Sequence, residues 1–143
     1  MNQSTKHDAL WPLEPLIKEA FSAQERAYAR YSHFPVGAAI YTKTGKIFSG
    51  ANVENASYGL TVCAERNAVM QAVISGDADI TTVVIVTIMS PPPMPCGMCL
   101  QVLSEFVKEC EIISMNVKGE RRSSLFSELL PTQFSFTGPQ RLG

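Results

Sequence analysis

Long apolar segments and an excess of positive charge are both missing from this chain of 143 residues. Its longest aliphatic run, residues 83–89, is far shorter than the roughly 20 residues that span a bilayer. Its polar start, residues 1–8, lacks the apolar core of a signal peptide. With 12 basic and 13 acidic residues, the chain has no surplus cations to neutralise a phosphate backbone. We therefore expect a cytoplasmic protein with no membrane or nucleic-acid partner. We expect its ligand to be a small neutral molecule.

Cysteine is also scarce, because the chain has only four. Small secreted domains that rely on disulfide bonds carry a far denser framework of cysteines. A chain of this length buries about 68–70% of the surface that it exposes when unfolded, so its core needs no such bonds. We expect reduced thiols and one domain that covers residues 1–143.

Helical and extended periodicities alternate along the chain and indicate an α/β protein. Helices are predicted at residues 13–31, 63–74, 95–107 and 124–130. Strands are predicted at residues 36–41, 46–52, 81–89 and 111–117, with a weaker fifth strand before the last helix. The run at 81–89 is apolar and mostly β-branched, which is typical of a central strand buried on both faces. The order predicts a three-layer α/β/α domain with a mixed central sheet of about five strands.

Residues 90–95 read Ser-Pro-Pro-Pro-Met-Pro, which excludes a helix or an inner strand there. The segment predicts a rigid loop that delivers Cys96 to the start of the next helix. The apolar face of that helix is expected to consist of Met98, Val102, Leu103, Phe106 and Val107.

Three of the four cysteines form two clusters typical of a metal site. Cys63 opens one predicted helix, and Cys96 and Cys99 open another. Unpaired N–H groups at helix starts favour anionic thiolates, and the two-residue spacing places Cys96 and Cys99 on one side of a first turn. A set of three sulfurs suits Zn2+ and leaves the fourth tetrahedral position for water or substrate. The spacing therefore predicts a catalytic zinc site.

Glu65 lies two residues after Cys63, too close to be an easy second ligand but near enough to reach a water on the same metal. A carboxylate in that place can take a proton from the water and hand it to a leaving group. Cys110 is the remaining thiol, and a continuous helix from the Cys96/Cys99 pair would place it about 16 Å along the axis from Cys99. We therefore predict that Glu65 is a proton shuttle. Cys110 is predicted to be a thiol with no part in the metal site, either buried or at the edge of the core.

In addition to these clusters, several longer segments resemble the cytidine deaminases, in particular the small three-cysteine form that is usually a homotetramer. The matching segments are YSHFPVGAA at 31–39, NVENASY at 52–58, CAER at 63–66, PCGMC at 95–99 and QVLSEF at 101–106. Weaker likeness continues to LLP at 129–131. The segments occur in the family's order and spacing.

The resemblance implies one Zn2+ per subunit, held by Cys63, Cys96 and Cys99. It also implies that Glu65 moves a proton from the metal-activated water to N3 of cytosine and to the departing ammonia. Zinc deaminases in general use this arrangement.

The same resemblance assigns substrate contacts. Asn52 and Glu54 would hydrogen-bond the ribose hydroxyls, and Phe34 would pack on the pyrimidine. The backbone N–H of Ala64 would bind the base carbonyl oxygen. Phe134, in the C-terminal tail, would reach into the site of a neighbouring subunit.

The chain departs from the family pattern at Leu100, where arginine is usual, at Met94, where serine is common, and at Arg30, where proline is frequent. Three thiolates on a divalent ion leave a net negative cluster, which arginines offset in the family. Arg66 remains beside Cys63. We therefore hypothesise that Arg66 alone suffices or that another group replaces the lost arginine.

Plainer interpretations stand beside these. By residue type alone, Phe34 fits a core position, Asn52 an ordinary turn, and Glu54 and Arg66 solvated charges. A lone CxxC is often redox-active or structural, but a thiol oxidoreductase would need no Glu65.

The leading function is hydrolytic deamination of free cytidine and deoxycytidine to uridine and deoxyuridine in pyrimidine salvage. One alternative is a deaminase of another cytosine nucleoside such as blasticidin S. Another is a non-catalytic, zinc-stabilised binding module. The chain lacks the basic strip expected of a deaminase that edits RNA or DNA.

Overall fold

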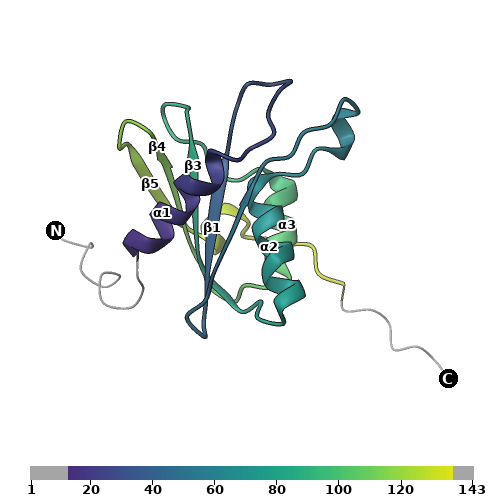
Figure 1. Cartoon of the computed structure of the whole chain (residues 1–143). Coiled ribbons are helices and arrows are strands. Elements are labelled where there is room, and N and C mark those ends of the chain that lie inside the picture. The colour runs from purple at the N-terminus through teal and green to yellow at the C-terminus, as the bar shows by residue number, and fades with distance from the viewer. Residues whose placement is uncertain (1–12, 137–143) are drawn as a thin grey trace.

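The computed structural model describes residues 13–136, which form a mixed sheet with helices on both faces (Figure 1). The polar start of the chain and residues 137–143 lie outside this described part. The helices are α1 (Leu13–Gln24), the 3-10 turn η1 (Tyr58–Leu60), α2 (Ala64–Ser75), α3 (Gly97–Ser104) and α4 (Phe126–Leu129). The strands are β1 (Gly37–Thr42), β2 (Ile47–Ala51), β3 (Ile80–Thr87), β4 (Glu111–Asn116) and β5 (Arg121–Leu125).

The sheet has five strands in the order β2-β1-β3-β4-β5. β3 and β4 are parallel, and the other neighbouring pairs are antiparallel. The predicted fold class is thus confirmed, and the β-branched run forms the central strand as expected. Within the described residues, no helix has the length and apolar character needed to cross a membrane.

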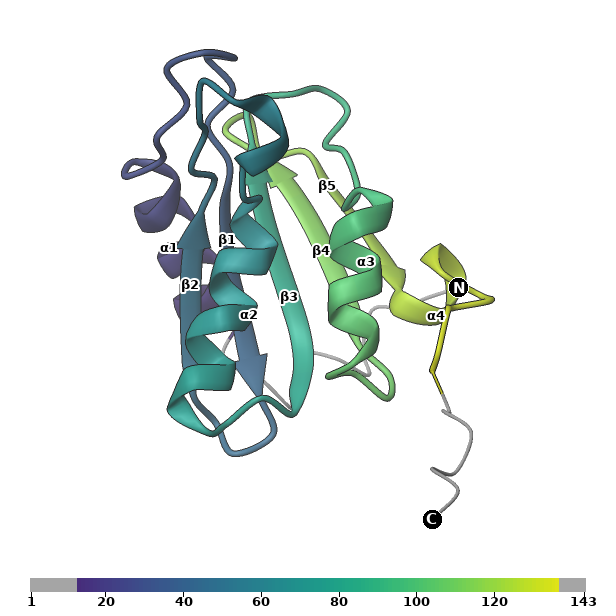
Figure 2. The same ribbon diagram turned by 90° about the vertical axis from the view of Figure 1, so that its right-hand side faces the viewer.

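Alternation along the strands explains why helices cover both faces of the sheet. Val84 and Val86 pack with Leu16 and Ala20 of α1, while Val83 belongs to the core formed with α2 and α3. Figure 2 shows α2 and α3 lying side by side over one face, with α1 behind the sheet. The two helices that begin with cysteines therefore share one side of the sheet.

The first helix is shorter than predicted, because it ends at Gln24 and not at residue 31. The Gln24 side chain donates to the Pro35 carbonyl oxygen at 3.1 Å. The chain then extends, and Tyr28 forms a parallel bridge with Val53. Contacts distant in sequence thus override the helical periodicity of residues 25–31.

Two further boundaries were wrong. α3 ends at Ser104, so Phe106 lies beyond it, and Met98 is exposed to solvent rather than part of an apolar face. The predicted last helix, residues 124–130, begins only at Phe126, because the two residues before it pair with β4 as the end of β5. The end of α2 at Gly76 was correct, and this glycine has the positive φ of 82° typical of a C-cap.

α2 packs unusually close to β2 at Gly50, which fixes the position of Cys63 at the helix start. A Cβ atom at Gly50 would lie 2.5 Å from the Ala68 nitrogen and 2.6 Å from the Ala64 carbonyl oxygen. We expect Gly50→Ala to lower the free energy of unfolding by about 3 kcal/mol, since the helix backbone must shift. Urea denaturation monitored by circular dichroism measures this change.

Gly59 provides the matched control, because a Cβ atom there would meet no heavy atom within 4 Å. Gly59→Ala should change the unfolding free energy by less than about 0.5 kcal/mol. Equal unfolding midpoints for the two variants would contradict the close packing of α2 on β2.

Candidate active site

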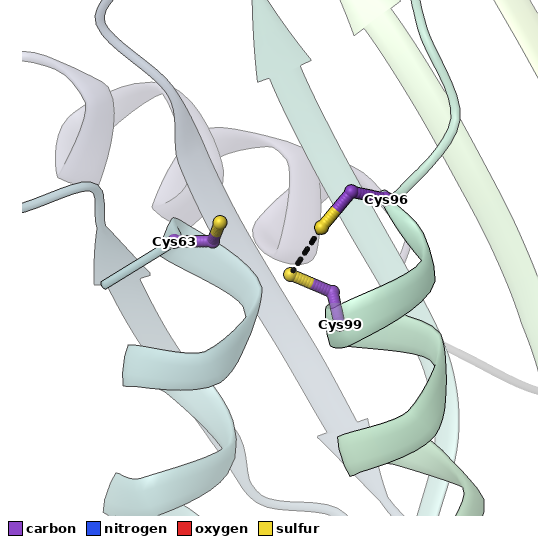
Figure 3. Close-up of side chains that lie close together, drawn as sticks. All are labelled: Cys63, Cys96 and Cys99. Atoms are coloured by element: carbon purple, nitrogen blue, oxygen red, sulfur yellow. Dashed lines mark hydrogen bonds between the residues drawn. The ribbon is translucent and has the colours of Figure 1, made fainter. Parts of the chain in front are cut away.

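The two cysteine clusters meet above the sheet, where α2 and α3 begin. Cys63 is the N-cap residue of α2, Cys96 is the N-cap residue of α3, and Cys99 lies in the first turn of α3. The three sulfur atoms all lie within 4.8 Å of one another, and those of Cys96 and Cys99 are 3.6 Å apart. Figure 3 shows the sulfur atoms of Cys96 and Cys99 facing each other at the start of α3, with Cys63 opposite them at the start of α2.

This arrangement fits a zinc ion. Tetrahedral coordination with Zn–S distances of about 2.3 Å separates two sulfurs by about 3.8 Å, close to the spacing between Cys96 and Cys99. All four cysteines of the chain are free thiols, so the three in the cluster are available as ligands. The donor set of three soft sulfurs favours zinc over magnesium or calcium.

Arg66 is the cation that contacts the cluster. Its Nη2 atom donates to the Thr61 carbonyl oxygen at 3.2 Å and to the Cys63 sulfur at 3.6 Å. The hydrogen bond with Cys99, together with the one from Arg66, lowers the pKa of Cys63 to about 5. Leu100 is buried in the core between α2, α3 and the sheet, and it adds no charge to the site. The charge compensation visible in the structure therefore comes from Arg66.

Glu65 is buried, with 6% of its surface exposed, and it lines the same cavity as Cys63 and Cys96. Burial raises the pKa of its carboxyl group above the ordinary value. A carboxyl group whose pKa moves toward neutrality can both take and release a proton. The position and environment of Glu65 thus suit the proton transfer predicted for it.

The cavity has a volume of about 200 Å³ and lies at the carboxyl end of β3. Its lining includes Phe34, Asn52 and Ala64, three of the residues assigned to substrate contacts, together with Thr87 and Pro93. Ala64 is the first residue of α2, so its backbone N–H is among those that the helix leaves unpaired. Apolar walls with a few polar groups are typical of sites for small molecules.

Asn52 and Glu54 both make hydrogen bonds within the chain. The Asn52 side chain donates to the Phe34 carbonyl oxygen at 2.9 Å and accepts from the Val36 N–H at 2.9 Å. Oε1 of Glu54 accepts from the N–H groups of two loop residues, Tyr31 and Ser32, each at 3.0 Å. Asn52 therefore fixes the loop that carries Phe34, and Glu54 fixes the neighbouring turn.

Glu54 lines a second cavity of about 390 Å³ together with Tyr31, Ser32 and Tyr58. Thr61 lines both this cavity and the one that contains the cysteines, so the two spaces adjoin. A ligand larger than one ring could extend from the thiol cluster toward Glu54.

Phe134 does not line either of these cavities. The residue is 71% exposed, and its carbonyl oxygen accepts a hydrogen bond from Nε2 of Gln101 at 3.0 Å. This contact places the C-terminal segment along α3. Cys110 is buried away from the cluster, as predicted, and donates to the Glu111 carbonyl oxygen at 3.5 Å.

One group of residues around the site was not predicted from the sequence. Ser114 and Arg122, on β4 and β5, donate hydrogen bonds to carbonyl oxygens of the proline-rich loop that precedes Cys96. The one available signal was the run of prolines itself, because a segment without N–H donors needs partners from elsewhere in the chain.

Comparisons with known proteins agree with this site. A family model described as "Cytidine and deoxycytidylate deaminase zinc-binding region" matches residues 12–115. A cytidine deaminase of Halalkalibacterium halodurans is 45% identical over 121 residues, which cover 84% of this chain and 92% of the relative. A blasticidin-S deaminase of Bacillus cereus is 33% identical over 108 residues, covering 70% of this chain and 76% of that protein.

The fold agrees with solved structures as well. A crystal structure of cytidine deaminase from Burkholderia pseudomallei superimposes with a TM-score of 0.81 at 44% sequence identity. The match covers 85% of this chain and 98% of that protein. The thiol cluster, the sheet order and these likenesses together lead to one conclusion: the chain belongs to the cytidine and deoxycytidylate deaminase family.

Proposed function

We propose that this protein catalyses the hydrolytic deamination of free cytidine and deoxycytidine to uridine and deoxyuridine, with release of ammonia, as a step of pyrimidine salvage. The observation that carries the proposal is a cluster of three thiols, two of which line one small cavity together with a buried carboxyl group. Relatives at 40–45% identity over most of the chain are named cytidine deaminases. The protein is proposed to act in the cytoplasm, where thiols stay reduced.

Cys63, Cys96 and Cys99 would hold one Zn2+ per subunit. A zinc ion held by thiolates supplies an activated water near neutral pH. Glu65 takes a proton from the attacking water and delivers it to N3 of the base, while the water oxygen forms a bond to C4. Glu65 then takes the second proton from the new C4 hydroxyl group and delivers it to the amino group, so that the C4–N4 bond breaks, ammonia leaves and C4 becomes a carbonyl.

The other residues bind and orient the nucleoside. Phe34 packs on the pyrimidine ring, and the Ala64 N–H donates to the base carbonyl oxygen. Asn52 and Glu54 receive the ribose, which is supported by the second cavity that adjoins the first at Thr61. Glu54 there offers a carboxylate, which favours an uncharged sugar hydroxyl over a phosphate.

A homotetramer completes the proposal, with Phe134 of one subunit reaching a neighbour's site. The homotetramer is supported by large apolar side chains that are exposed to solvent in the single chain. They include Met70, Val73 and Ile74 on α2 and Phe134 in the C-terminal segment. Sedimentation equilibrium measures the assembly, and a monomer at all concentrations would exclude it.

The two alternatives are less well supported. The blasticidin-S deaminase is more distant than the cytidine deaminases, at 33% identity. A zinc-stabilised binding module would have no use for Glu65 in the cavity, since burying a carboxyl group is costly unless it has a role.

Ultraviolet absorbance of zinc-loaded protein with cytidine, deoxycytidine and blasticidin S tests the proposed function. We expect loss of cytidine and deoxycytidine absorbance, which would show that the thiolate charge is compensated without an arginine at position 100, by Arg66 alone or together with another group. A metal-loaded protein that converts no nucleoside, and that Leu100→Arg makes active, would contradict that role of Arg66. Conversion of blasticidin S alone would overturn the substrate assignment.

A further inference from the structure

The loop between β3 and α3 forms part of the cavity wall but has almost no means of fixing its own backbone. Four of the residues from 91 to 95 are prolines, so Met94 has the only backbone N–H in that stretch. Pro93, Met94, Pro95 and Cys96 all line the cavity. Their position must therefore be set by donors from other parts of the chain.

Those donors are side chains of β4 and β5, the two strands that follow β3 in the order of the sheet. The Ser114 hydroxyl donates to the Pro93 carbonyl oxygen at 2.7 Å, and Nη1 of Arg122 donates to the Pro92 carbonyl oxygen at 3.1 Å. Nδ2 of Asn116 donates to the Met89 carbonyl oxygen at 3.0 Å. Side chains of β4 and β5 thus donate to three carbonyl groups, two in the proline-rich loop and one, that of Met89, in the segment that leads into it.

The register of the sheet explains how these donors reach the loop. Ser114 lies beside Ile85 of β3 and beside Arg122 of β5, so the three residues form one row across three strands. Ile85 lines the cavity that contains Cys63 and Cys96. Ser114, which is fully buried, is therefore the next position outward from the cavity wall.

We propose that Ser114 is a positioning residue, whose hydrogen bond to the Pro93 carbonyl oxygen sets the place of Met94 and Cys96 against the bound nucleoside and metal. Pro93 is three residues from Cys96, and rigid proline rings transmit a shift at one end of the segment to the other. The inference rests on the proposed function, because it concerns the reactants of that site.

Two matched pairs of variants isolate the hydroxyl group. Ser114→Ala removes it from the natural side chain, while Ser114→Thr and Ser114→Val have the same shape and differ in the hydroxyl alone. We expect kcat/KM for cytidine to be about 10- to 100-fold lower in Ser114→Ala than in the wild type. A misplacement of about 1 Å at a reacting centre can reduce the rate by about 10²-fold. The Thr variant should exceed the Val variant by a similar factor, even if the added methyl group perturbs both.

A second readout needs no substrate. A chelator should withdraw zinc about 10-fold faster from Ser114→Ala than from wild type, because the loop that carries Cys96 is less firmly held. If the wild type converts no nucleoside, the proposed function fails, and the withdrawal rates alone decide the role of Ser114.

Thr82→Val is the control for the loss of a buried hydroxyl group. Thr82 is fully buried on β3, and its hydroxyl has no hydrogen-bond partner within the described residues. Its removal should leave kcat/KM and zinc withdrawal unchanged. Equal kcat/KM for Ser114→Ala and wild type, or for the Thr and Val variants, would overturn the inference. A loss of kcat/KM in Thr82→Val equal to that in Ser114→Ala would also overturn it.

Discussion

Replacing Glu65 by glutamine is expected to reduce kcat for cytidine by about 10³- to 10⁴-fold, at the upper end of what general acid–base catalysis contributes. Glutamine has the size of glutamate and fills the same buried space, but it cannot take the proton of the attacking water. KM should rise little, because the proposed substrate contacts lie on other residues, namely Phe34, Asn52 and Ala64. Steady-state absorbance kinetics at saturating cytidine measure the loss.

The control for this substitution is Glu105→Gln, which makes the same chemical change at an exposed position after α3. It should keep wild-type kcat, and both variants should contain as much zinc as the wild type. If Glu65→Gln retained more than a tenth of wild-type kcat, the proton-transfer role of Glu65 would be wrong.

Replacing Cys99 by serine is expected to weaken zinc binding by more than about 100-fold, since loss of an outer-shell partner alone costs about 10- to 100-fold. Serine keeps a polar group in the first turn of α3, but its hydroxyl is a harder and less easily ionised ligand than a thiol. Activity should fall with the metal content. Atomic emission of the purified protein measures zinc per chain.

Cys110→Ser tests whether the loss is specific to the cluster. Burial raises the pKa of the Cys110 thiol to about 12, so this cysteine stays protonated and is a poor metal ligand. The variant should therefore bind one zinc ion per chain, like the wild type. Zinc retention by Cys99→Ser, or its loss from Cys110→Ser, would contradict the three-thiol site.

The fold could be predicted where a local pattern is unambiguous. The β-branched run that became β3 allowed a central strand to be predicted, and Gly76 marked the end of α2. The end of α1 could not be predicted, because it depends on Gln24 reaching the Pro35 carbonyl and on Tyr28 pairing with Val53. β5 has no clear alternation, and its strand arises from pairing with β4.

The candidate site, like the fold, could be predicted only where the signal is local. Cysteines carry their chemistry in the residue type, so Cys63, Cys96 and Cys99 stood out from their spacing alone. The contact between Ser114 and Pro93 depends on the register of β3 and β4, and the two residues are 21 positions apart in sequence. A serine in a strand gives no local sign of such a contact.

The proline-rich segment beside the cavity also determines how motion at the site can be observed. Amide hydrogen exchange reports opening through backbone N–H groups, and residues 91–95 offer only that of Met94. Hydrogen-exchange measurements will therefore report almost nothing about residues 91–95, however much this segment moves. The methyl group of Met94 reports there instead, and with six methionines in the chain a methyl-labelled NMR spectrum is sparse enough to resolve it. Ligand entry would then be followed through one resonance of a side chain rather than through the backbone.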